Sequence, residues 1–150
     1  MEFSDFLKKL LGIGSDFEVS EVTVEEKSKE INIHLNYIPK RYTVQGKGYP
    51  IYDQAPERKW QHLNWFEYKC YIICSIPRYV NSEGKVTTID IDFAPKSRSY
   101  TNKFSQQVIL YLQTVRVQST VANLLNTSAY IVRSIMEDAV ENALSTRGFI

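Results

Sequence analysis

The chain has 150 residues, of which 43% are hydrophobic and 23% are charged, and its formal net charge is +1. This composition is sufficient for one or two small folded domains and excludes a disordered tail. No stretch has the apolar length needed to span a bilayer, and the start MEFSDFLKKLLGIG lacks the basic region and cleavage site of a secretory signal. We therefore expect a cytoplasmic protein with no membrane partner.

Residues 1–40 predict a short helix followed by a β-hairpin. Apolar residues recur at helical spacing from Phe3 to Leu11, and Gly12 is expected to stop the helix. Two strands with alternating residues follow at Phe17–Val24 and Glu30–Tyr37, and the first strand changes phase at Ser20–Glu21. The residues that compete for the buried face are Val19, Val22 and Val24 on one strand and Ile31, Ile33 and Leu35 on the other.

Residues 41–95 predict a small antiparallel β unit rich in aromatic residues. Its strands are expected at Lys59–Trp65, Glu67–Ile76 and Val86–Phe93, the last two joined by the turn NSEGK. Cys70 and Cys74 lie four residues apart, so on a strand they project from one face. Buried reduced thiols are favoured over a disulfide or a zinc site, because zinc needs four ligands and this spacing is not C-x-x-C.

Residues 96–150 predict three helices, at about Phe104–Thr114, Ser119–Leu125 and Ser128–Leu144. The first of these has a continuous apolar stripe made of Phe104, Val108, Tyr111, Leu112 and Val115. This segment carries six Lys and Arg residues against three Asp and Glu, whereas the rest of the chain carries twelve against fourteen. The positive charge is therefore concentrated in the helical segment.

The run from Val117 to Met136 has the pattern of a DNA-binding helix-turn-helix. Asn126 is expected at the turn, because Asn tolerates a positive φ better than any residue except Gly. Ser128 is the N-cap candidate of the second helix. The inner faces of the two helices are formed by Val121, Ala122 and Leu125 on the first and by Val132, Ile135, Met136 and Ala139 on the second.

The outward residues at the start of the second helix are the candidates for contacts with DNA bases. They are Tyr130, Arg133 and Ser134. Candidates near phosphates are Lys103, Arg116, Ser119, Thr127 and Ser128. The excess of positive charge is modest, so one copy should bind double-stranded DNA weakly, and self-association is a further possible interaction. The alternatives are a three-helix bundle without nucleic acid, or a protein-interaction or oligomerisation module.

Five short motifs follow one another along the middle of the chain. They are YD at Tyr52–Asp53, W-x-H-L at residues 60–63, PR at Pro77–Arg78, Phe93–Ala94 and Tyr100–Thr101. In this order and spacing, the chain from Tyr42 to Leu144 resembles the N-terminal region of DDE-type insertion-sequence transposases, which carries a zinc ribbon ahead of a helix-turn-helix. The resemblance implies recognition of the terminal inverted repeats of a mobile element. Cutting and joining would belong to a separate RNase H-like domain that uses three carboxylates and divalent metal.

The zinc ligands of that family are replaced here. The matching positions are Tyr42, Gln45, Asn81 and Gly84, and these residues do not supply the thiolate, imidazole or carboxylate donors that tetrahedral zinc requires. His34 and His62 are too few to rebuild a site, and a structural hydrogen bond is favoured for His62. We therefore expect a ribbon without metal or cofactor, stabilised by Tyr42, Tyr49, Trp60, Trp65, Phe66, Tyr68 and Tyr71.

No catalytic site is predicted from the sequence. Asp90 and Asp92 would share one strand face, and a solvated face is favoured over a metal site. No P-loop and no G-x-S-x-G motif is present. We expect an α+β chain with an N-terminal helix and hairpin (1–40), a zinc-less ribbon (41–95) and a helix-turn-helix that binds DNA (96–150). It would be the recognition fragment of a transposase, or a shortened relative that kept recognition and lost cutting.

Overall fold

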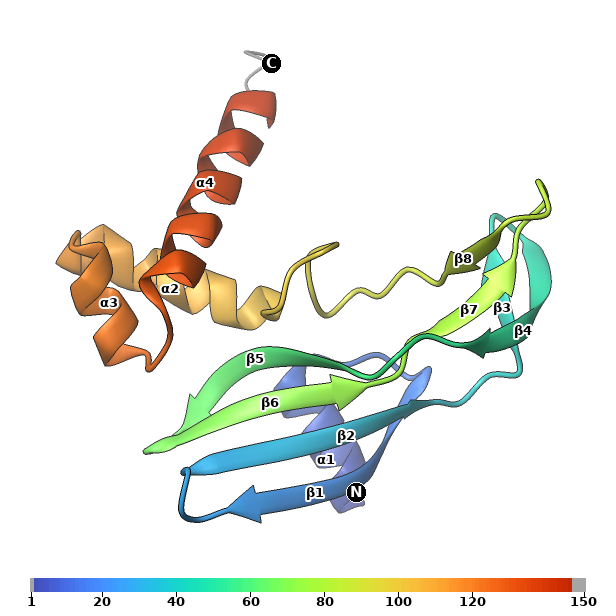
Figure 1. Ribbon diagram of the computed structural model, residues 1–150, viewed down its shortest axis with the longest axis horizontal. Coiled ribbons are helices and arrows are strands. Elements are labelled where there is room, and N and C mark those ends of the chain that lie inside the picture. The colour runs from blue at the N-terminus through green and yellow to red at the C-terminus, as the bar shows by residue number, and fades with distance from the viewer. Residues whose placement is uncertain (1, 147–150) are drawn as a thin grey trace. The chain divides into compact units, whose positions relative to one another are not determined.

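The computed structural model describes residues 2–146, and the chain is α+β, as expected from the sequence (Figure 1). It divides into two compact units, one ending at Thr101 and the other beginning at Asn102. In the described residues, the first unit has a helix and two sheets, and the second has three helices. This division differs from the expected one, because residues 1–40 and 41–95 belong to the same unit.

Helix α1 (Phe3–Leu11) packs on the first sheet through one face. Leu7 and Leu11 are buried, whereas Phe3 and Phe6 are exposed. Gly12 ends the helix in the left-handed conformation, with φ 72°. The prediction of a helix stopped at this glycine is therefore confirmed, since glycine has no Cβ to oppose a positive φ.

The first sheet has the strand order β1-β2-β6-β5 and forms the core of its unit. Its strands are β1 (Phe17–Glu25), β2 (Glu30–Tyr37), β5 (Arg58–Trp65) and β6 (Tyr68–Cys74). β1 pairs with β2 and β5 with β6 in antiparallel fashion, whereas β2 and β6 are parallel. This parallel pair joins the N-terminal hairpin to the middle of the chain, which is why residues 1–40 do not form a separate domain.

The hairpin β1–β2 has the predicted phase change and resolves the competition for its buried face. The register shifts between Val19 and Glu21. Ile31, Ile33 and Leu35 of the inner strand are buried, whereas Val22 and Val24 of the edge strand are exposed. Ile31, Ile33 and Leu35 are buried because β2 lies between two other strands and its apolar face is covered by the core.

The second sheet has the strand order β3-β4-β7-β8 and is antiparallel throughout. Its strands are β3 (Arg41–Val44), β4 (Lys47–Gln54), β7 (Pro77–Val80) and β8 (Val86–Thr88). The β3–β4 hairpin was not among the predicted strands. Gln45 and Gly46 form its two-residue turn, and both have a positive φ (52° and 77°), as a type I′ turn requires.

Two predicted strand boundaries in this region are wrong. The expected strand at residues 67–76 ends at Cys74, and a separate strand begins at Pro77. Proline has no N–H for the ladder and is tolerated at the first residue of a strand, so a new strand can begin there. The turn NSEGK therefore joins β7 to β8, and β8 ends at Thr88 instead of continuing to Phe93.

The second unit consists of α2 (Asn102–Val115), α3 (Gln118–Leu124) and α4 (Ala129–Thr146), close to the predicted helices. Its buried residues are Phe104, Val108, Val121, Ala122, Leu125, Val132 and Ile135. Tyr111, Leu112 and Val115 of the predicted stripe on α2 are only half-buried. None of the helices within residues 2–146 is long and apolar enough to cross a membrane.

Candidate nucleic-acid interface

The turn between α3 and α4 has the local geometry that the sequence predicted. Asn126 has φ 55°, in the left-handed region. The N–H of Thr127 donates to the carbonyl of Ala122 at 2.9 Å and so closes the end of α3. Leu125 is buried beside Val121 and Ala122 in the sequence-predicted inner face. A short helix, a left-handed Asn and a second helix thus follow within a few residues.

Ser128 caps the start of α4. Its Oγ accepts a hydrogen bond from the N–H of Ile131 at 3.1 Å, and its carbonyl accepts one from the N–H of Val132 at 3.2 Å. An N-cap serine in this arrangement stabilises a helix by about 1 kcal/mol. The cap sets where the helix begins, and therefore which residues of its first two turns face inward. Val132 and Ile135 are the ones buried.

The outward face of α4 begins with two exposed residues that were predicted as base-reading candidates. Tyr130 is 75% exposed, and Arg133 is also exposed. They are three residues apart and therefore lie on one face of the helix. Ser134 is half-buried at the margin of that face. Within residues 2–146, Arg133 forms no ion pair, so its guanidinium is available to a ligand.

The candidate phosphate contacts lie at three places in the second unit. Thr127 and Ser128 lie at the start of α4, and Ser119 lies in the first turn of α3, close in sequence to Arg116. Lys103 is exposed in the first turn of α2. Arg116 lies at the other end of α2, about 20 Å away at the helical rise of 1.5 Å per residue. These two cations therefore cannot contact the same phosphate.

Two contacts in this unit were not foreseen from the sequence. Arg116 has φ 64° and ends α2, with its N–H bonded to the carbonyl of Leu112 at 3.1 Å. Gln118 Nε2 lies 3.4 Å from Met136 Sδ, which links the start of α3 to α4. No sequence pattern predicts the positive φ of Arg116, because arginine rarely adopts the left-handed conformation. No sequence pattern predicts the contact between Gln118 and Met136 either.

The positions expected to correspond to zinc ligands have structural roles at one end of the second sheet. Tyr42 stacks on Tyr79, with ring centroids 4.9 Å apart. Asn81 Oδ1 accepts hydrogen bonds from the N–H groups of Glu83 and Lys85. Since β4 and β7 are antiparallel, the β3–β4 turn and the β7–β8 turn lie at the same end of the sheet (Figure 1).

Three contacts connect the five sequence motifs, and W-x-H-L takes part in two of them. The carboxylate of Asp53 in YD accepts two hydrogen bonds from Arg78 in PR. Trp60 of W-x-H-L packs edge-on against Phe93, with centroids 5.2 Å apart.

His62 in the same W-x-H-L motif is hydrogen-bonded through Nδ1 to Thr101 Oγ1 at 2.7 Å, and both residues are buried. The expected structural hydrogen bond of His62 is thus confirmed. Together with the two preceding contacts, it shows that these motifs stabilise the fold of the first unit.

The two cysteines are buried and reduced, as predicted. Burial raises the pKa of Cys70 to about 12 and, with the nearby charge of Glu57, that of Cys74 to about 11. Both are therefore protonated at neutral pH and are poor metal ligands or nucleophiles. Among residues 2–146, no group of three His, Cys, Asp or Glu side chains is placed to hold a metal ion.

The acidic pair Asp90 and Asp92 does not lie on a strand, contrary to the prediction. β8 ends two residues before Asp90, and the N–H of Asp90 donates to the hydroxyl of Tyr42 at 3.3 Å. Both carboxylates are on exposed residues. The shared strand face on which a metal was considered therefore does not exist.

Comparisons with known proteins give no relatives for this chain. No family model matches it, and neither a curated protein nor a solved structure matches it. The residues and their geometry are therefore the basis for assigning a function.

Proposed function

We propose that the helical unit beginning at Asn102 binds double-stranded DNA as a helix-turn-helix of a cytoplasmic protein. One observation carries the proposal. At the start of α4, the buried residues Val132 and Ile135 alternate at helical spacing with the exposed residues Tyr130 and Arg133. A capped helix that presents polar side chains from its first turns is what recognition in the major groove requires.

The exposed side chains suit base edges and phosphates. An arginine can donate two hydrogen bonds to guanine O6 and N7, which is the commonest specific contact in the major groove. A tyrosine or serine hydroxyl can donate to or accept from either base edges or phosphates. Arg133 is therefore assigned the main base contact, with Tyr130 and Ser134 beside it. Lys103, Arg116, Ser119 and Thr127 are assigned to phosphates.

The relationship to transposases is part of this proposal. Two features support a terminal-repeat recognition region, or a shortened protein derived from one. The four positions matched to zinc ligands belong to two hairpins whose turns share one end of a sheet. The short motifs of the resemblance contact one another in the first unit. In this reading the zinc ribbon persists as a β unit held by the packing of Tyr42 and Tyr49 against Tyr79, whereas Phe66, which was expected to contribute, is 95% exposed.

A second copy of the chain would compensate for the low positive charge of one copy. An apolar groove of about 300 Å³ lies between α2 and α4 within the second unit. It is lined by Ile109, Leu112, Gln113, Met136, Ala139, Val140 and Ala143. Self-association through this groove would place two α4 helices on one duplex, and sedimentation equilibrium with and without Val140→Glu tests it.

The test of DNA binding uses the full chain. Duplexes are selected from a random-sequence pool, and binding of the selected duplex and of a scrambled one is measured by fluorescence anisotropy over a range of salt concentrations. We expect preference for the selected duplex and an affinity that falls as salt rises. Selection that yields no preferred sequence would contradict the proposal, as would an affinity independent of salt.

A further inference from the structure

Strand β8 forms an open edge of the second sheet. β8 is the last strand in the order β3-β4-β7-β8, so only one of its sides is paired. On the β7 side, the carbonyl of Lys85 accepts a hydrogen bond from the N–H of Asn81 at 2.9 Å, and the N–H of Ile89 donates to the carbonyl of Pro77 at 3.0 Å. Bonded positions alternate along an antiparallel pair, so the N–H and C=O groups of Val86 and Thr88 point away from β7.

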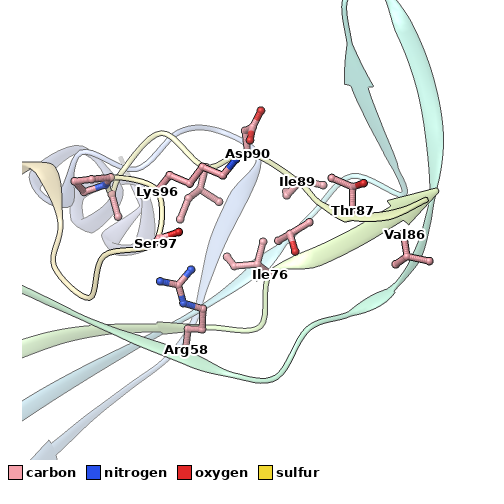
Figure 2. Close-up of a pocket in the computed structure, with 12 residues that line it drawn as sticks. Arg58, Ile76, Val86, Thr87, Ile89, Asp90, Lys96 and Ser97 are labelled. Carbon is pink, nitrogen blue, oxygen red and sulfur yellow. The ribbon is translucent and has the colours of Figure 1, made fainter. Parts of the chain in front are cut away.

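A cavity of about 470 Å³ runs along this open edge (Figure 2). Residues 86–91, six in succession, line it. Side chains alternate between the two faces of an extended chain, so a cavity above one face would be lined by every second residue. Because consecutive residues line the cavity, it lies along an edge of this segment. β7 occupies one edge of β8, so the cavity lies along the open edge.

The wall opposite β8 is cationic. Arg58 is held in position, because its guanidinium stacks on the ring of Trp60 at 4.6 Å and its Nη2 donates to the carbonyl of Arg98 at 2.8 Å. Lys96 also lines the cavity and forms no ion pair with any carboxylate in residues 2–146. One acidic residue, Asp90, also lines the cavity. The two cations are thus available to an anionic ligand.

The floor of the cavity is apolar. Ile76, Ile89 and Ala94 line it, and each is buried. A phosphate group would use the two cations but would leave the apolar floor and the open backbone groups of β8 without partners. An extended peptide would use the cations, the apolar floor and the open backbone groups of β8. Its backbone pairs with the edge, and its alternating side chains can reach both the cations and the apolar surface.

We propose that this cleft binds an extended acidic peptide segment of another protein, which adds as a strand beside β8. Backbone groups of the segment pair with Val86 and Thr88. Its carboxylates meet Arg58 and Lys96, and its apolar side chains pack on the exposed side chain of Val86 above the apolar floor. The proposal concerns the first unit alone and does not depend on DNA binding by the helices.

The experiment titrates the full ¹⁵N-labelled chain with the capped peptide Thr-Val-Glu-Val-Glu-Thr. We expect saturable shifts of the Val86 and Thr88 amide signals, with a Kd on the order of 0.1–1 mM. The same peptide with N-methyl groups on its backbone should bind about tenfold more weakly, because it cannot pair with the edge. A peptide with lysine in place of glutamate should also bind more weakly.

Protein variants test each side of the cleft. Thr88→Pro removes an N–H that points away from β7 and should lower the affinity about tenfold without breaking a bond to β7. Lys96→Gln should lower it severalfold. Lys27→Gln removes the same charge in the β1–β2 turn and should leave the peptide affinity unchanged. Because N-methylation alters only the peptide, it tests pairing even if Thr88→Pro misfolds.

Three outcomes would overturn the proposal. The first is an absence of saturable shifts at millimolar peptide, and the second is equal binding of the N-methylated and unmodified peptides. The third is a duplex oligonucleotide that shifts the same amides and loses affinity on Lys96→Gln while the peptide does not bind. That result would make the cleft a phosphate contact. DNA binding by α4 can succeed or fail in a separate titration.

Discussion

Asp53 on β4 and Arg78 on β7 face each other across adjacent strands, and the arginine donates two hydrogen bonds to the carboxylate. Nε reaches Oδ1 at 2.6 Å. The hydrogen bonds from Arg78 lower the pKa of Asp53 below its ordinary value of 3.8. Both side chains are more than a third exposed, so water and salt weaken the pair.

The first prediction concerns acid stability. A carboxyl whose pKa is lowered by folding stabilises the native state above its unfolded pKa, and this contribution disappears as the pH falls through the folded value. Asp53→Asn should therefore lower the Tm modestly at neutral pH, and the difference from wild type should shrink as the pH falls below 3.8 and vanish once the pH is below the lowered pKa of Asp53. Thermal unfolding followed by circular dichroism at several pH values measures this. A difference that stays constant into acid, or that also occurs in the control Glu18→Gln, would refute it.

The second prediction concerns the buried bond between His62 and Thr101. Thr101→Val keeps the shape of the side chain and leaves His62 Nδ1 without its partner at 2.7 Å. An unsatisfied buried polar atom costs about 1–3 kcal/mol, so the free energy of unfolding should fall by that amount. Urea denaturation of the full chain measures it. If Thr101→Ser is as damaging as Thr101→Val, the hydroxyl is not what matters.

The third prediction concerns cysteine reactivity. With the pKa of Cys70 at about 12 and that of Cys74 at about 11, the thiolate is a very small fraction of either residue at neutral pH. Iodoacetamide should therefore leave both cysteines unmodified in the native protein and alkylate both in denaturant. Intact-protein mass spectrometry counts the adducts. Rapid native alkylation would show that the core opens on the timescale of the reaction.

The fourth prediction separates base contacts from phosphate contacts. Arg133→Ala should cost about 1–3 kcal/mol at the preferred site and relax its specificity. Lys103→Ala should weaken all sequences similarly and reduce the salt dependence by about one unit of slope. Fluorescence anisotropy with selected and scrambled duplexes measures both effects. Wild-type affinity of Arg133→Ala for the selected site would remove α4 from the role of reading helix.

The fifth prediction concerns metal. We expect the purified chain to contain no stoichiometric zinc and to keep its circular dichroism spectrum in chelator, because Tyr42, Gln45, Asn81 and Gly84, the positions that the resemblance matches to zinc ligands, supply no zinc donor. A structural zinc contributes on the order of 10 kcal/mol in small domains, so its removal would be obvious. Elemental analysis decides the point. One tightly held zinc per chain would mean that the zinc site uses other residues.

Local features of this chain were readable from the sequence, because a single residue determines each of them. Gly12 ends a helix, Asn126 takes a positive φ and Ser128 caps a helix, all as predicted. The outward position of Arg133 follows from the same cap, because the cap fixes the helical register. The amphipathic helices were predicted to within a few residues, because their apolar spacing and the residues at their ends are also local features.

Features that depend on distant residues were not readable. Nothing in Glu30–Tyr37 specifies that it pairs in parallel with Tyr68–Cys74, because this choice depends on how the whole sheet packs. The turn at Gln45–Gly46 lacks the usual Asn-Gly pair, so its hairpin was missed. The cleft beside β8 combines Arg58, Lys96 and an edge strand, which no sequence spacing brings together.

The parallel pairing of β2 with β6 imposes an order on the folding of the protein during its synthesis. β2 is translated before its neighbour β6, so the nascent hairpin β1–β2 has an unpaired edge on β2 and an apolar face that only α1 can cover. Chains that stop before Tyr68 should therefore aggregate or bind chaperones. Extension through Cys74 supplies the missing strand, and from that length onward the nascent chain can begin to close its core.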